Sequence, residues 1–378
     1  MRVAIITLPL HTNYGGILQA YALKKSIEAL GHSADVIDRK CKIVPPPRWK
    51  MPFIYIKRTL LQFRPKSRRP EIFRERRILR EFPKVSSLLH PFVTQEVSPR
   101  MVRGYNDIAL GEYDAFVVGS DQVWRPRYFG RIEEAFLDFT SRWNVRRIAY
   151  AASFGTEQLE YSYEQLEACS ALLKGFKAVS VREAGAVTLC DEWFDREDAV
   201  HVLDPVMLLP AGHYAEIARK SSEHPAKGKV LSYILDTDPS KKAVLQKVKG
   251  WLGGMPEHDA YIPDRDPRIP LARRIVPPME QWLSCFADAE FVVTDSFHGC
   301  VLSILFHKPF IALVNPSRGM SRVQSLLESF QLEDRIVQGL DPDDDGEYYL
   351  ADIDWDRIDA RLEELKASSL SFLTNALK

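Results

Sequence analysis

Short runs of β-branched and aliphatic residues alternate with helical patterns along this chain, and this alternation constrains its fold more than any other feature. Such alternation is typical of βαβ units, which build parallel sheets. In the first half of the chain, helical patterns lie between most of the strand-like runs. We expect strands at residues 3–8, 34–38, 115–118, 147–152, 178–181 and 200–203, and helices at 16–30, 161–174 and 183–190.

The pattern starts again after Leu203-Asp204-Pro205. A chain of 378 residues is too long for one ordinary core. We therefore predict an α/β protein with two domains, 1–205 and 206–350, whose strand ends face one cleft, where ligands of such sheets bind. A last helix within 351–378 could pack back on the first domain. In the second domain we expect strands at 230–235, 290–294 and 309–314, and helices at 239–252, 279–287, 299–306 and 322–330.

Charge and cysteine content exclude several classes of protein. Lys plus Arg and Asp plus Glu both number 51, so the whole molecule has no net field that would attract nucleic acid. The five cysteines include no CxxC pair, which argues against a disulfide framework and a zinc site and favours a reducing cytoplasm. The apolar start leads into a glycine turn and is typical of a first strand. No stretch is long and apolar enough to span a membrane.

One segment departs from this balance. Residues 40–80 hold fourteen cations and only two acidic residues, a local charge of +12. Between residues 49 and 63, aromatic and aliphatic residues alternate with cations, as they do in interfacial membrane segments. Two interpretations stay open: a lid over an anionic, lipid-linked substrate with peripheral membrane contact, or a solvated insertion that covers part of the sheet.

Two glycines follow the first predicted strand, where a helix begins. Gly15 and Gly16 would let a ligand approach the backbone, and the helix N-terminus offers unpaired N–H groups to an oxyanion. The spacing is not GxGxxG and no P-loop lysine follows, which argues against a nicotinamide dinucleotide site. Taken alone, the pair would equally suit a plain tight turn.

Polar side chains follow three more strands at their carboxyl ends, where an open α/β sheet binds ligands. Ser120, Asp121 and Gln122 follow the third strand, and Trp124 could stack on a sugar face. The alternative is that Asp121 caps a helix and Trp124 belongs to the core. Ser153 ends the fourth strand, and Arg182 ends the fifth, where it could hold an anion.

In the second domain, a strand ends in Thr294-Asp295-Ser296-Phe297-His298-Gly299. His298 would stand at a helix N-terminus, facing the cleft. A bound phosphate would favour its protonated form, so it is a general acid conditional on the donor being bound. The alternative is a structural histidine. Arg318 and Arg322 lie in a later turn, and either could bind an anion or simply face solvent.

Taken together and in this order, the segments NYGGILQAYAL (13–23), VGSDQVW (118–124), YAASFG (150–155), VRE (181–183), TDSFHG (294–299) with KPF (308–310), and RGMSR (318–322) resemble the polysaccharide pyruvyl transferase family. The resemblance spans residues 1 to about 336 and leaves 40–110 unmatched, which we interpret as a basic insertion.

The resemblance implies a GT-B-like fold with two Rossmann-like domains. It also implies a bacterial-type, cytoplasmic enzyme that transfers a pyruvyl group from phosphoenolpyruvate to two hydroxyls of one sugar, forming a cyclic ketal on a surface or capsular polysaccharide. His298 takes the place of the family's catalytic histidine. Many members carry arginine two residues earlier, where this chain has Ser296, so the other arginines become the candidate ligands of phosphate and carboxylate.

The implied chemistry needs an acid, cations and a polar sugar site, and needs neither metal nor cofactor. Two alternatives stay open: a glycosyltransferase that uses a nucleotide sugar, and a non-catalytic glycan-binding module. Phosphoenolpyruvate and a glycan or lipid-linked acceptor are the expected partners. The candidate site residues are, for catalysis, His298 and Asp121; for the donor, Arg182, Arg318, Arg322, Ser296 and Gly299; and for the acceptor, Asn13, Gly15, Gly16, Gln19, Ser120, Gln122, Trp124 and Ser153.

Overall fold

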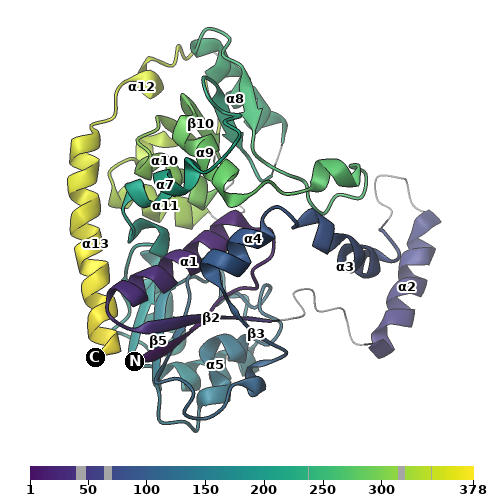
Figure 1. Cartoon of the computed structure of the whole chain (residues 1–378), viewed down its shortest axis with the longest axis vertical. Helices are drawn as coiled ribbons and strands as arrows, with labels where there is room; N and C mark the ends of the chain where they lie inside the picture. The colour runs from purple at the N-terminus through teal and green to yellow at the C-terminus, as the bar shows by residue number, and fades with distance from the viewer. Residues whose placement is uncertain (40–47, 64–69, 237, 314–319, 342) are drawn as a thin grey trace.

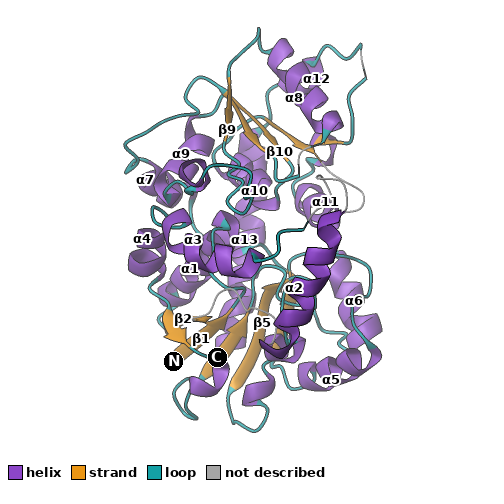
Figure 2. Cartoon of the chain, turned by 90° about the vertical axis from the view of Figure 1, so that its right-hand side faces the viewer, coloured by secondary structure: helices purple, strands orange, loops and turns teal. Residues whose placement is uncertain are grey.

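A computed structural model describes residues 1–39, 48–63, 70–236, 238–313, 320–341 and 343–378. Its described strands form two parallel sheets, one in each half of the chain (Figure 1). Figure 2 shows the two sheets one above the other, with helices around each of them. The prediction of an α/β protein with two Rossmann-like domains is confirmed.

The first sheet has seven strands in the order β3-β2-β1-β4-β5-β6-β7. All its neighbouring pairs are parallel. The strand β4 reads Ala-Phe-Val-Val and is buried throughout, as expected for a parallel strand covered on both faces. The strands are β1 (Arg2–Ile6), β2 (Ser33–Arg39), β3 (Arg100–Val102), β4 (Ala115–Val118), β5 (Arg146–Ala152), β6 (Ala178–Val181) and β7 (Val200–His201).

The helices of the first domain begin where their sequences provide caps. The side chain of Asn13 accepts a hydrogen bond from the N–H of Gly16 and starts α1 (Tyr14–Ala29). Ser162 and Gln165 form a capping box at the start of α5 (Tyr163–Leu173). The helix α6 (Gly185–Phe194) follows β6 and leads towards the last strand of this sheet.

The second sheet has five strands in the order β12-β11-β10-β8-β9. The edge strands β9 and β12 escape prediction because they are short and β9 reads Glu-His-Asp, so no apolar run marks them. The strands are β8 (Val230–Tyr233), β9 (Glu257–Asp259), β10 (Phe291–Thr294), β11 (Phe310–Leu313) and β12 (Ile336–Val337). The helices are α7 (Ala211–Ala218), α8 (Pro239–Trp251), α9 (Met279–Asp288), α10 (Phe297–Leu305), α11 (Met320–Ser329) and α12 (Glu347–Leu350).

The last helix, α13 (Trp355–Leu377), runs back along the first domain (Figure 1). The Oγ of Ser369 accepts a hydrogen bond of 3.0 Å from the N–H of Leu203, and Phe372 meets the ring of Tyr150 in β5. Leu373 and Leu377 are buried in the core that both domains share. The helix therefore ties the end of the chain to the first sheet.

Between β2 and β3, the chain forms an outlying helical segment. It contains α2 (Met51–Leu60), α3 (Arg74–Val85) and the short α4 (His90–Phe92). Figure 1 shows α2 as the outermost element, separated from the two sheets by α3. The α4 end packs into the core through Leu89, Phe92 and Val93, whereas none of the α2 side chains is buried.

Candidate active site

A cleft of about 850 Å³ lies between the two domains. Thr7 and Asp121, which follow β1 and β4, line its first-domain wall. Tyr233 at the end of β8 and Asp295 directly after β10 line its second-domain wall. In both sheets these strand pairs are the place where the strand order reverses, and α/β sheets bind ligands at that place. The topology thus brings the switch points of both sheets to one cavity.

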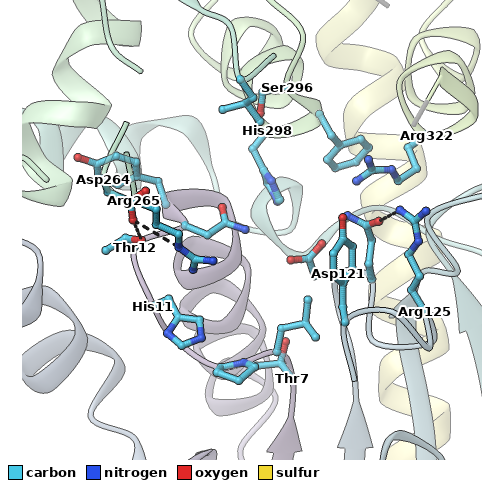
Figure 3. Close-up of a pocket in the computed structure, with 18 of the residues that line it drawn as sticks. Thr7, His11, Thr12, Asp121, Arg125, Asp264, Arg265, Ser296, His298 and Arg322 are labelled. Atoms are coloured by element: carbon cyan, nitrogen blue, oxygen red, sulfur yellow. Dashed lines mark hydrogen bonds and ion pairs between the residues drawn. The ribbon is translucent and has the colours of Figure 1, made fainter. Parts of the chain in front are cut away.

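His298 stands in the first turn of α10 and lines the cleft (Figure 3). Ser296 also lines the cleft, and its Oγ caps the helix by accepting from the N–H of Gly299 at 3.4 Å. His298 is only 8% exposed, and its Nε2 lies 3.7 Å from Oδ2 of Asp204. Among the described residues this Nε2 has no hydrogen-bond partner. The predicted acid is therefore buried at the cleft with a carboxylate beside it.

The first turn of α1 lies directly against this imidazole. A Cβ built on Gly15 would lie 2.1 Å from Nδ1 of His298, so a side chain there would displace the ring. Gly16 is less tightly placed, with Asn13 and Asp121 as its nearest neighbours. The glycine pair thus admits the histidine of the other domain close to the backbone. A side chain at Gly299 is excluded in the same way, because a Cβ built there would lie 2.2 Å from Oγ1 of Thr294.

Arg182 is buried beneath the first-domain wall. Its Nη1 lies 3.0 Å from Oδ2 of Asp204, its Nη2 lies 3.4 Å from Oδ1 of Asp121, and its Nε lies 3.6 Å from Glu183. The guanidinium also stacks over the ring of Phe297 at 4.4 Å. Arg182 does not line the cleft. Its place favours a role in holding carboxylates, and its predicted role as a direct donor ligand has no support in this geometry.

Asp204 is the residue of this cluster that sequence reasoning missed. Its Oδ1 accepts from the N–H of Val206 at 3.0 Å, and its Oδ2 accepts from the Oγ of Ser120 at 3.1 Å as well as facing Arg182 and His298. Burial alone would raise the pKa of Asp204, but His298 and Arg182 outweigh it and hold this pKa well below its usual range. The available signal was an acidic residue directly after the predicted strand at 200–203, at the predicted boundary between the two domains.

Asp121 lies between this cluster and the cleft, and Figure 3 shows its carboxylate below His298. Its backbone φ of 72° lies in the left-handed region, which residues other than glycine rarely adopt. The turn therefore holds Asp121 in an unusual conformation at the cleft. Gln122 also lines the cleft and accepts a hydrogen bond of 3.1 Å from Nη1 of Arg125.

Arg322 is the predicted donor-binding arginine that reaches the cleft. It lies in α11, and its Nε is buried without a hydrogen-bond partner among the described residues. Burial lowers the pKa of its guanidinium, and the neighbouring positive charge of Arg182 lowers it further. The carboxylates of Glu183 and Asp121 act on this pKa in the opposite direction. Because its Nε has no hydrogen-bond partner among the described residues and lies at the cleft, it can donate to a bound anion. Arg318 lies outside the described residues.

Four of the predicted acceptor side chains are internal. The expectation that Trp124 stacks on a sugar is wrong, because its indole is fully buried, stacks on Phe136 and donates to the carbonyl of Ala135 at 3.1 Å. The other three are Gln19, Ser120 and Ser153. Their hydrogen bonds run to Thr7, to Asp204 and to Glu183 respectively, so they brace the wall from behind. Asn13 and Gln122 do line the cleft.

The far end of the cleft holds polar residues that sequence reasoning did not single out. The Oγ1 of Thr12 donates to Oδ2 of Asp264 at 2.5 Å, which links the two domains (Figure 3). Lys241 forms an ion pair of 2.7 Å with Asp295. Arg265 also lines this end. Among the residues that the structure describes, no three His, Cys, Asp or Glu side chains are grouped as metal ligands would be.

A comparison with protein families decides where this site belongs. The family model described as polysaccharide pyruvyl transferase matches residues 13–317, which is most of the chain. The chain belongs to the polysaccharide pyruvyl transferase family. The matched range contains His298, Gly15, Asp121, Arg182 and Asp204, and it ends before Arg322. No protein with a curated description matches this family member.

Solved structures resemble this pyruvyl transferase family member at low identity. UDP-GlcNAc 2-epimerase from Neisseria meningitidis, bound to UDP-GlcNAc, is 10% identical over 100% of this chain and 99% of its own, with a TM-score of 0.51. UGT89C1 from Arabidopsis thaliana is 11% identical over 99% and 98%, with a TM-score of 0.48. At this identity, the first likeness shows a shared fold and does not identify a substrate. The predicted GT-B-like fold is confirmed.

Proposed function

We propose that this protein transfers the pyruvyl group of phosphoenolpyruvate to two hydroxyls of one sugar in a glycan precursor, forming a cyclic ketal and releasing phosphate. One observation carries the proposal: the Nε2 of His298 is buried at the cleft beside Asp204, without a hydrogen-bond partner among the described residues. A protonated His298 would have Asp204 as its counter-ion. Membership of the family supplies the reaction class.

His298 acts as the general acid in this proposal. Its proton adds to the methylene carbon of phosphoenolpyruvate, which becomes a methyl group, and an oxocarbenium-like centre develops at C2. A sugar hydroxyl attacks C2, the C2–O bond to phosphate breaks, and the phosphate leaves with the bonding electrons. A second hydroxyl of the same sugar then closes the ring. One hydroxyl proton replaces the proton that His298 gave to the methyl group, and the other leaves on the phosphate as hydrogen phosphate.

The donor is held by positive charge on the second-domain wall. Arg322 faces the cleft, and its Nε has no hydrogen-bond partner among the described residues, so a bound phosphate or carboxylate would satisfy it. The N-terminus of α10, capped by Ser296, adds a favourable dipole for an anion. Arg318 stays a predicted second ligand.

The acceptor sugar lies against the first-domain wall in this proposal. Asn13 and Gln122 line that wall and can hydrogen-bond to sugar hydroxyls. Asp121 lies at the same wall and is our candidate acceptor of a hydroxyl proton. No step of the scheme requires a metal or a cofactor.

We further propose that the acceptor is carried on a lipid at the cytoplasmic face of a membrane. No helix in the described part of the chain is long and apolar enough to cross a bilayer. Contact with the membrane would therefore be peripheral, and the basic segment 40–80 is its candidate site.

The test is an assay of phosphate release. The protein is incubated with candidate acceptors and phosphoenolpyruvate, and in parallel with nucleotide sugars. The proposal predicts phosphate release that depends on acceptor, and a product heavier than the acceptor by pyruvate less one water. Turnover with a nucleotide sugar and none with phosphoenolpyruvate would contradict it.

A further inference from the structure

A stripe of large apolar side chains covers the outer face of the helical segment at α2. Its five members are between 59% and 89% exposed. They recur at spacings of four and three residues, so they fall on one face of a helix. We call this set the α2 stripe; it consists of Trp49, Phe53, Ile56, Leu60 and Phe63.

The opposite face of α2 is already used. Arg58 forms two hydrogen bonds with Glu75, of 2.8 and 2.7 Å, and Tyr55 packs edge-on against Phe73. Gln62 donates to the carbonyl of Pro70 at 2.6 Å. These contacts fix α2 against the start of α3 and orient the helix. The α2 stripe therefore points outward on an oriented helix.

Positive charge flanks the α2 stripe. Lys50 and Lys57 are exposed and lie seven residues apart, so both lie along the same edge of the stripe. Lys50 also lies over the ring of Trp49 at 4.9 Å. In the described part of 48–80, Glu71 and Glu75 are engaged by Arg77 and Arg58. The other cations leave this surface strongly positive.

The segment is attached at the mouth of the cleft. Glu81 of α3 forms an ion pair of 2.8 Å with Arg274, and Arg77 donates to the carbonyl of Arg265, which lines the cleft. In Figure 1, α2 stands out from the body of the molecule. A surface bound by α2 would therefore lie close to the cleft.

We propose that the α2 stripe docks on an anionic lipid bilayer. The aromatic and aliphatic side chains enter the boundary between headgroups and acyl chains, while Lys50 and Lys57 meet the headgroup phosphates. Charge decides against a second copy of this chain as the occupant, because pairing of two α2 helices would bring like-charged lysines together. The further statement that this docking brings a lipid-linked acceptor to the cleft rests on the proposed function.

The test is co-sedimentation of the full chain with lipid vesicles, made of phosphatidylcholine alone or with added phosphatidylglycerol. We expect Ile56→Glu with Leu60→Glu to weaken binding to the anionic vesicles about tenfold or more. The matched control, Leu110→Glu with Leu159→Glu, changes two exposed leucines elsewhere and should bind as the wild type does. Lys50→Gln and Lys57→Gln should each weaken binding about fivefold, and only to anionic vesicles.

Two outcomes overturn this inference. One is equal sedimentation of the wild type and the Ile56→Glu, Leu60→Glu variant. The other is a wild-type dimer, measured by light scattering, that the same variant dissociates while neither binds vesicles. Phosphate release with a short soluble acceptor separates this inference from the proposed function, since the variant should keep that activity. If neither the wild type nor the variant turns over phosphoenolpyruvate, the proposed function is contradicted, but the vesicle result is unaffected.

Discussion

Behind the first-domain wall, Arg182 forms ion pairs with three carboxylates and does not line the cleft, whereas on the second-domain wall His298 and Arg322 line the cleft with buried nitrogens that have no hydrogen-bond partner in the described part of the chain. The first wall therefore balances the charge of Arg182 inside the protein before any ligand arrives. The second keeps buried polar atoms that a ligand can satisfy, and unpaired buried polar groups are costly. In the proposed function, the first wall is therefore a preorganised support that also carries Asp121, and the second wall offers the acid and a cation to the donor.

The largest effect on activity is expected when the imidazole of His298 is removed. We expect His298→Ala to lower turnover about 10² to 10⁴-fold, because the scheme loses its acid. The free energy of unfolding, measured by the midpoint of urea unfolding, should change far less than the activation free energy of turnover. His90→Ala, at an exposed histidine of α4, is the control. Retained turnover in His298→Ala would show that the second wall does not carry the reactive group.

Removing Asp204 tests the support on the first wall. Asp204→Asn leaves Arg182 and His298 with less counter-charge, so we expect a loss of about 3–5 kcal/mol in the free energy of unfolding at neutral pH. Because the folded pKa of Asp204 lies below its ordinary value of about 4, its contribution is present above that pH and is lost as the pH falls.

The difference between wild type and Asp204→Asn should therefore shrink as urea unfolding is measured at pH values below about 4. Asp191→Asn, at an exposed aspartate, should show no such trend. A difference that stays constant on acidification would mean that the Asp204 cluster does not have the electrostatics described above.

Arg322→Gln removes a positive charge from the second wall. Loss of a charged ligand should raise the KM for phosphoenolpyruvate about 10 to 100-fold, with a smaller change in kcat. Steady-state kinetics of phosphate release measures both. The control is Arg103→Gln, at an arginine whose side chain is 82% exposed. An unchanged KM would assign the donor to other cations.

Gly15→Ala probes the contact between the two walls. The added methyl group would overlap the imidazole of His298, so the ring must shift. We expect about a tenfold loss of turnover, in line with the roughly 1–3 kcal/mol that overpacking costs. Gly212→Ala, where no atom lies within 4 Å of the added Cβ, should behave as the wild type. Full activity of Gly15→Ala would show that the glycine is not there to admit the histidine.

The sequence predicted what parallel topology dictates. Apolar runs such as β4 and β10 marked the strands, and because parallel strands end at one edge, the residues after them were expected to converge. His298, Asp121 and Asn13 do line one cleft. The strand β9 was hidden because backbone hydrogen bonds to β8, and not apolar side chains, place it in the sheet.

Two further errors have a common cause. Trp124 is in the core because the chain turns inward after Asp121, and Asp204 meets His298 because the crossing between the domains lies against α10. Both facts depend on the path of the chain after a strand ends. A local pattern of residue types carries no signal for that path, so the direction of a side chain in such a turn could not be predicted.

The most direct test of the account follows the proton itself. The protein is incubated in heavy water with phosphoenolpyruvate and an acceptor, and the product is analysed by mass spectrometry. We predict one deuterium in the methyl group of the ketal for each phosphate released. In His298→Ala, we expect both the deuterated ketal and the phosphate release to be lost. A ketal without deuterium, or equal phosphate release by His298→Ala, would contradict the claim that His298 protonates the donor at this cleft.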